Sequence, residues 1–337
     1  MSSPPATDVE TSTRARGAGA KLVAVVLGMA ALVTVMLCAF ALPGVNGGPH
    51  DVPIGVAGPD QVTRAAEQKL AGDAWDVTVY DSPEALKSAV GDREIAGGLA
   101  ASAGGMDVYT ATAGGPMAAG ALTTVGDGLA ARQDVRATVH DLVPFPEDDP
   151  RGAGFSSAAL PLIFGGVFPA ALLGRLFRGR KGLGPRLAGA LLFSLVAGAA
   201  VAAVLQYGTG SLDGGYRLTA LGLSLGVAAL SITFVGLEAL FGLVGLGLGA
   251  AVMMFLGNPL SGLATGPYWL PAGWAALGQA LPPGASGSLL RANAFFDGAG
   301  AGAPALVLGG WVLLGVVLVL IARGRGPRGA DALPTAG

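Results

Sequence analysis

The chain has 337 residues, of which 52% are hydrophobic and only 12% are charged. Soluble domains carry roughly 25% charged residues, so this composition excludes an ordinary soluble protein and indicates an integral membrane protein. The formal net charge of −2 also excludes a strongly basic nucleic-acid binder.

Residues 21–42 contain the first long apolar stretch, which follows a basic flank formed by Arg14, Arg16 and Lys21. The stretch is long enough to cross a membrane. Its length and the poor cleavage sequence "ALPG" favour a retained anchor over a cleaved signal peptide. Residues 1–20 are expected to form a disordered cytoplasmic tail.

Residues 43–155 differ from the rest of the chain and hold sixteen of its 22 acidic residues. Alternating apolar residues predict strands at "DVPIGVAG", "WDVTVYD", "MDVYTATA" and "VRATVHDLV". Helices are predicted at "PDQVTRAAEQKLAG", after the cap sequence Ser82-Pro83-Glu84, and over residues 116–132. An extra strand at "IAGGLAAS" is compatible with this order. The pattern predicts one small α/β domain outside the membrane.

Five further membrane spans are predicted, at residues 156–174, 187–206, 218–236, 239–257 and 303–322. The stretch from 218 to 257 is about twice as long as one crossing requires, at roughly 1.5 Å per residue. It is therefore expected to fold back, with its turn in "FVGLEALFG", around Gly236 and Glu238.

The positions of the basic residues test the prediction of six spans, because Lys and Arg concentrate in cytoplasmic segments. Eleven of the chain's 20 basic residues lie in three segments that six spans would place in the cytoplasm: 14–21, 175–186 and the tail, 324–337, with Arg323 beside it. The shorter external segments contain only Arg217 and Arg291. The sequence thus predicts an α-helical polytopic protein with six spans in a bacterial cell membrane and both termini in the cytoplasm.

The sequence lacks the local motifs of several common catalytic machineries. It has no P-loop, no G-x-S-x-G, no H-E-x-x-H and no C-x-x-C pattern. The chain is therefore not expected to be an enzyme or to need a cofactor. His50 and His140 each precede an aspartate, but a metal site needs further close ligands, so the favoured interpretation is a flanking residue and a strand residue that faces water.

The loop "RLFRGRKGLGPR", called here the basic loop, carries five cations within twelve residues. A topology anchor beside anionic lipid accounts for such a cluster, and a docking element for a cytoplasmic partner is the functional alternative. The five cations are Arg175, Arg178, Arg180, Lys181 and Arg186.

Glu238 is the one acidic residue within 218–257. A carboxylate at depth would be a candidate for a proton or ion pathway. Because Glu238 falls at the expected turn, the favoured interpretation is a solvated carboxylate at the membrane edge. The interiors of the other spans carry no Asp, Glu, Lys, Arg or His, which argues against a proton-driven transporter.

The segment "GNPLSGLATGPYWLPAGWAALGQALPPG" is too broken to span a membrane and too apolar for an ordinary solvated loop. We expect a helix from Pro271 with an apolar stripe at Leu270, Trp274, Leu277 and Leu281, ended by Pro282-Pro283-Gly284. A second helix through "LLRANAFF" would be capped by Ser286 or Ser288.

Two such helices predict a hairpin that dips into the outer leaflet, and an amphipathic loop on the external surface is the alternative. The candidate residues of this external gate are Pro259, Pro267, Trp269, Pro271, Trp274, Pro282 and Pro283.

Four stretches carry a resemblance to a known family: "VPIGVAG", "EIAGGLA", "DLVPFPEDDPRGAG" and the run from "GNPLSGLATG" to "LLRANAFFDG". Together with the order of one span, a large external domain and five spans, they resemble the ABC-2 type transporter permeases, in particular the branch of phage-infection-protein-like membrane proteins. The resemblance covers most of residues 20–323.

The resemblance implies the membrane-spanning half of an exporter, which forms a homo- or heterodimer and binds separate ATPase subunits. It implies that the basic loop, from Arg175 to Arg186, couples to the ATPase, and that residues Pro259 to Phe296 form external re-entrant helices. The large external domain departs from the simplest members and is shared with members that act in the cell envelope or assist secretion. A receptor or secretion-accessory protein that works through this domain is therefore the alternative function.

Overall fold

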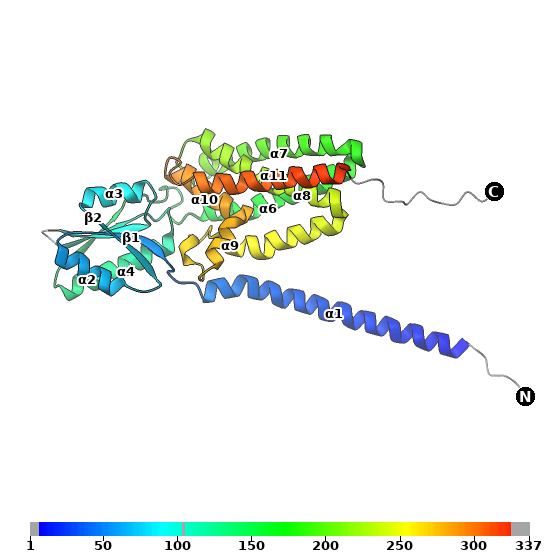
Figure 1. Cartoon of the computed structure of the whole chain (residues 1–337), viewed down its shortest axis with the longest axis horizontal. Coiled ribbons are helices and arrows are strands. Elements are labelled where there is room, and N and C mark those ends of the chain that lie inside the picture. Colours follow the sequence, from blue (N-terminus) through cyan, green and yellow to red (C-terminus); the bar gives the residue numbers. More distant parts are fainter. Residues whose placement is uncertain (1–6, 103–104, 325–337) are drawn as a thin grey trace, which may run out of the picture. The chain divides into compact units, whose positions relative to one another are not determined.

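The computed structural model describes residues 7–102 and 105–324. The chain divides after Val45 into two compact units, and each is described by itself. The first is helix α1, Thr7–Val45 (Figure 1), whose apolar part, Lys21–Leu42, buries none of its side chains. The expected disordered tail is therefore wrong for residues 7–20, which are helical, and residues 1–6 lie outside the described part.

The second unit begins with a five-stranded sheet of order β2-β1-β3-β4-β5. Strands β3 and β4 are antiparallel, and the other neighbouring pairs are parallel. The four predicted strands are confirmed, and the extra strand at "IAGGLAAS" is β3. The strands are β1 Val52–Ala57, β2 Trp75–Tyr80, β3 Gly97–Ser102, β4 Gly105–Thr110 and β5 Arg136–Asp141.

Three helices cover this sheet: α2 Asp60–Leu70, α3 Pro83–Gly91 and α4 Pro116–Arg132. Helices α2 and α4 share one apolar core with β1 and β4, and α3 packs into a separate core. The alternation of apolar residues in β1 places Val52, Ile54 and Val56 toward α2 and α4. The predicted cap is confirmed, because Ser82 Oγ accepts a hydrogen bond from the Ala85 amide at 3.1 Å.

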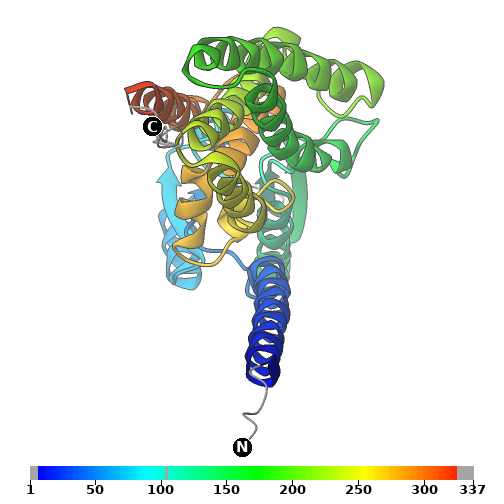
Figure 2. The same cartoon turned by 90° about the vertical axis from the view of Figure 1, so that its right-hand side faces the viewer.

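Within the described residues, five helical stretches are long and apolar enough to cross a membrane. The chain is thus a multi-pass membrane protein. Beyond α1 these stretches are Ala153–Leu176, Arg180–Gly208, Tyr216–Gly257 and Gly302–Gly324. The first contains α5 Ala153–Ser157 and α6 Ala159–Leu176, and the second contains a 3-10 turn and α7 Leu183–Ala203 with its last turn. The third is α8 with its last turn, and the fourth is α11. Figure 2 views the bundle end-on, and α8 packs against α6, α7 and α11.

Helix α8, Tyr216–Val252, reverses direction within its length, at the end of the bundle far from the sheet (Figure 1). Gly242 has φ 66° and ψ −154°, which breaks the helix. After the break Gly249 lies against Leu237, because a Cβ built on Gly249 would be 2.6 Å from Leu237 Cδ1. The expected fold-back is therefore confirmed.

The reversal lies at Gly242, the last residue of the predicted turn "FVGLEALFG", and not around Gly236 and Glu238, where the prediction centred it. Gly236 instead packs against α11, where a Cβ on it would lie 2.7 Å from the Gly315 carbonyl oxygen. Gly236 serves close helix packing, whereas Gly242 supplies the positive φ that the reversal requires.

Between α8 and α11 the chain forms two short 3-10 turns, Pro259–Ser261 and Pro267–Trp269, and two helices, α9 Trp274–Ala280 and α10 Pro282–Phe295. The helices meet at Leu281, whose backbone is extended. Two helices were predicted, but Pro282-Pro283-Gly284 opens α10, because proline fits the first helical turn. Ser286 and Ser288 therefore lie inside α10 and cap nothing.

Candidate functional site

Arg186 and Glu238 form a buried ion pair at the end of the bundle where α8 reverses. Their side chains are 7% and 16% exposed, and Arg186 Nη1 donates to Glu238 Oε2. The guanidinium also donates from Nε to the Phe177 carbonyl at 2.6 Å and from Nη2 to the Gly174 carbonyl at 3.2 Å. One side chain thus joins the end of α6, the start of α7 and the middle of α8.

This geometry corrects two predictions. Glu238 is not a solvated turn residue, because its carboxylate is largely buried and paired. Arg186 is not an exposed cation of the basic loop, because it lies in α7 and is 6% exposed. A buried pair of this kind is costly to break, since removing one partner leaves an uncompensated charge.

The four remaining cations of the basic loop, Arg175, Arg178, Arg180 and Lys181, are exposed. Arg180 Nε donates to the Arg323 carbonyl at 3.0 Å, which connects the loop to the last turns of α11. The loop therefore presents positive charge to the solvent while Arg186 and Arg180 hold it to α8 and α11.

Helix α10 is enclosed by the bundle, and its residues from Pro282 to Ala294 are all buried. Helix α8 approaches it through two glycines. A Cβ on Gly226 would lie 2.4 Å from Ser286 Oγ, and one on Gly222 would lie 2.5 Å from Asn293 Nδ2. We call this contact the α8–α10 seam. Only glycine allows two helices to approach so closely here.

The seam contains polar atoms that lack partners. Thr219 Oγ1, Ser286 Oγ and Asn293 Oδ1 are buried without a hydrogen bond among the described residues. Buried polar groups are normally paired, so each exception calls for an explanation.

The predicted gate residues have differing environments. Pro282 and Pro283 are buried in the first turn of α10, and Trp274 is 40% exposed. The remaining four, Pro259, Pro267, Trp269 and Pro271, are partly exposed. Of the predicted apolar stripe, Leu270 and Leu281 are buried, whereas Trp274 and Leu277 face outward.

Two arginines join α10 to the α/β domain, at a region called here the junction. Arg291 is 1% exposed. Its Nε donates to the Ala113 carbonyl at 2.8 Å, and its Nη2 donates to the Leu263 carbonyl at 3.0 Å. Its guanidinium carbon lies 4.8 Å from the centroid of the Phe155 ring. Arg93 Nη1 donates to the Ser288 carbonyl at 3.0 Å.

The junction arginines are electrostatically unusual, because among the described residues neither forms a salt bridge. Burial, reinforced by the charge of Arg93, lowers the pKa of Arg291 to about 9, so this group remains protonated at neutral pH. Burial also lowers the pKa of Arg93, and nearby Tyr268 partly opposes that shift.

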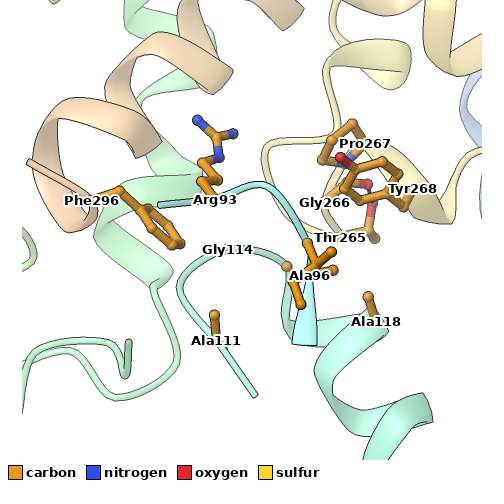
Figure 3. Close-up of a pocket in the computed structure, with 12 residues that line it drawn as sticks. Arg93, Ala96, Ala111, Gly114, Ala118, Thr265, Gly266, Pro267, Tyr268 and Phe296 are labelled. Carbon is orange, nitrogen blue, oxygen red and sulfur yellow. Dashed lines mark hydrogen bonds between the residues drawn. The ribbon is translucent and has the colours of Figure 1, made fainter. Parts of the chain in front are cut away.

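A small cavity of about 40 Å³ opens beside Arg93 at the junction. Figure 3 shows Arg93 rising from its loop toward α10, with Phe296 on one side of it and Tyr268 and Pro267 on the other. The cavity is lined by the α/β domain (Arg93, Ile95, Ala96, Ala111, Gly114, Gly115, Ala118) and by the segment around α10 (Thr265, Gly266, Pro267, Tyr268, Phe296). We call it the junction pocket.

The histidines lie elsewhere. His140 is an exposed residue of β5, as predicted, and its Nε2 lies 3.1 Å from Asp107 Oδ1, while its ring stacks on Tyr109. His50 Nδ1 lies 2.8 Å from the Gly48 carbonyl. The described residues contain no group of three side chains suited to a metal.

Sequence patterns singled out neither Arg291 nor Arg93 as a site residue. The available signal for Arg291 was its charge within the apolar run "GSLLRANAFF". No family model, no curated protein and no solved structure matches this chain. Its function must therefore be argued from these sites.

Proposed function

We propose that the chain is the membrane-spanning permease subunit of an ATP-driven exporter of the ABC-2 type. It would lie in the bacterial cell membrane and act as a homo- or heterodimer, and separate ATPase subunits would hydrolyse the nucleotide. The observation that carries the proposal is the attachment of the basic loop to the bundle through Arg186 and Arg180. A partner that displaces this loop would act directly on α8 and α11.

The proposal includes six membrane crossings. The two arms of α8 on either side of Gly242 would each cross, and α10 would enter the membrane from the outer side without spanning it. The exposed cations of the basic loop would then face the cytoplasm, where positive charge concentrates.

In the proposed exporter, α8 would move relative to α10 at the α8–α10 seam. The first arm of α8, before Gly242, carries Glu238 toward one end and contacts α10 through Gly222 and Gly226 toward the other, so a shift of this arm reaches both. The unpartnered side-chain oxygens of Thr219, Ser286 and Asn293 favour a second arrangement in which these atoms find partners in water or in a substrate.

The proposal is tested by purifying the chain with candidate ATP-binding-cassette ATPases from the same genome and measuring ATP hydrolysis in lipid nanodiscs. We expect a stable complex whose hydrolysis rate is altered by the chain. Replacing Arg178 and Lys181 with glutamine should weaken the complex, while Arg136→Gln, an exposed site on β5, should not. Absence of both a complex and any change in hydrolysis would refute the exporter.

The alternative function, an envelope receptor or secretion-accessory protein, is favoured by the firm attachment of the α/β domain through Arg291. The same double variant discriminates between the two. A receptor that works through its external domain would keep its activity without the loop cations, whereas an exporter would lose it.

A further inference from the structure

The junction pocket combines a cavity with an excess of positive charge. Arg93 borders the cavity directly, and Arg291 binds Ala113, which lies between the lining residues Ala111 and Gly114. Glu94 follows Arg93 in the chain but is exposed, and among the described residues it forms no salt bridge with either guanidinium. Two cations therefore share a largely desolvated region without a carboxylate.

Arg93 also retains hydrogen-bonding capacity. A guanidinium carries five N–H donors, and within the described residues Arg93 uses one hydrogen bond, to the Ser288 carbonyl, besides its contact with the Phe296 ring. The Tyr268 hydroxyl lies across the pocket from Arg93 (Figure 3). Thr265 lies on the same wall, but its hydroxyl donates to the Gly266 carbonyl at 3.2 Å.

The size of the pocket restricts the ligand. A volume of about 40 Å³ holds a few water-sized atoms, given that one water needs roughly 10–15 Å³ by this measure. That is room for an anionic head of a few oxygen atoms and excludes a whole nucleotide or sugar. Tyr268 is 36% exposed, so the pocket can be reached from outside.

We propose that the junction pocket binds a small oxyanion of the phosphate class through Arg93, with the Tyr268 hydroxyl as a further donor. Guanidinium groups suit phosphate because their planar donors match its oxygens. Binding would supply the negative charge that Arg93 and Arg291 lack, and would strengthen the contact between the α/β domain and the segment around α10.

The phosphate group has two sources, a free anion and the headgroup of an anionic lipid. The backbone around Tyr268 also binds the linker before β1, since the amide of His50 donates to the Tyr268 carbonyl at 3.1 Å. An occupied pocket would therefore rigidify that linker as well. The proposal concerns binding alone and does not depend on the exporter function.

The test titrates the full chain in non-ionic detergent with inorganic phosphate and, separately, with soluble short-chain phosphatidylglycerol. Tryptophan fluorescence reports binding, because Trp269 adjoins Tyr268, and thermal unfolding gives a second readout. We expect saturable binding of at least one probe, weakened about tenfold or more in Arg93→Gln, as loss of a charged hydrogen bond predicts. Arg64→Gln, an exposed arginine of α2, is the matched control.

Binding of inorganic phosphate identifies a free anion as the ligand, and binding of phosphatidylglycerol alone identifies a headgroup. The Tyr268→Phe variant leaves the fold and Arg93 in place and should weaken the same binding by a smaller factor. No saturable binding of either probe by the wild-type chain would overturn the proposal, as would equal affinities for Arg93→Gln and Arg64→Gln.

Discussion

Arg186 fixes the position of the basic loop through its side-chain contacts. Its three hydrogen bonds reach Gly174 and Phe177 at the end of α6 and Glu238 in α8. Because the pair is shielded from water, its attraction is screened less than that of a surface ion pair. The pair therefore holds the basic loop in a defined position relative to the reversal of α8.

A double-mutant cycle measures this coupling. Arg186→Gln and Glu238→Gln should each lower the free energy of unfolding by about 3–5 kcal/mol, because each leaves the other charge buried without a partner. The double variant should lose less than the sum of the two single losses. Thermal unfolding of the detergent-solubilised chain is the measurement, with Arg175→Gln, an exposed cation of the basic loop, as control. Additive effects would show that the two side chains are not coupled.

Sequence reasoning missed the residue-scale contacts for a physical reason. Arg291 is held by the carbonyls of Ala113 and Leu263, and every residue has a carbonyl, so no pattern marks these partners. Arg186 and Glu238 are 52 positions apart, and only the tertiary fold brings them together. The solvated carboxylate was inferred from a turn that lies elsewhere.

Helix α8 is the element on which the architecture depends. It contacts α6, α7, α10 and α11, and its fold-back follows from a length of 42 residues including its last turn. The length of the stretch predicts that it must reverse, and the placement of the basic residues predicts on which side of the membrane the reversal lies. Neither identifies the residue, because the chain has 57 glycines and only tertiary contacts separate Gly236, used for packing, from Gly242, used for the break.

The role of Gly242 is testable by substitution. A Cβ there would meet no atom within 4 Å, so Gly242→Ala introduces backbone strain at φ 66° and no clash. Because φ 66° with ψ −154° is a region open essentially to glycine alone, we expect a loss of about 1–3 kcal/mol in the free energy of unfolding. Gly247→Ala, also in open space but with ordinary helical backbone, should be neutral or stabilise by up to about 1 kcal/mol. Equal effects of the two substitutions would place the break elsewhere.

At the scale of the whole molecule, the α/β domain and the bundle are joined by more than a linker. Arg291 and Arg93 reach across the junction, and Phe145, in the loop after β5, packs edge-on against Phe295 of α10. The strand and helix order of the domain was predictable, because alternation and caps are local signals. Its attachment to α10 was not, because the contacts join segments far apart in the sequence.

The six-crossing arrangement makes a prediction about both faces of the membrane. Single cysteines are introduced into a Cys38→Ser background, which removes the chain's one native thiol, and are labelled with a membrane-impermeant maleimide. In intact cells we expect Ser88→Cys, on α3, and Ala272→Cys, before α9, to react. Val244→Cys, beside the reversal and 80% exposed, and Arg178→Cys should react only after lysis.

The labelling of Val244→Cys and Ala272→Cys decides how many times the chain crosses the membrane, because the second arm of α8 lies between these two positions. Labelling on opposite sides requires that this arm cross the membrane, and labelling on the same side would leave the α8 hairpin as a re-entrant element and refute six crossings. Ser88 and Arg178 calibrate the two faces independently of α8. If Val244 proves to be inside, the exposed cations of the basic loop and the Arg186–Glu238 pair lie where a cytoplasmic ATPase can reach them.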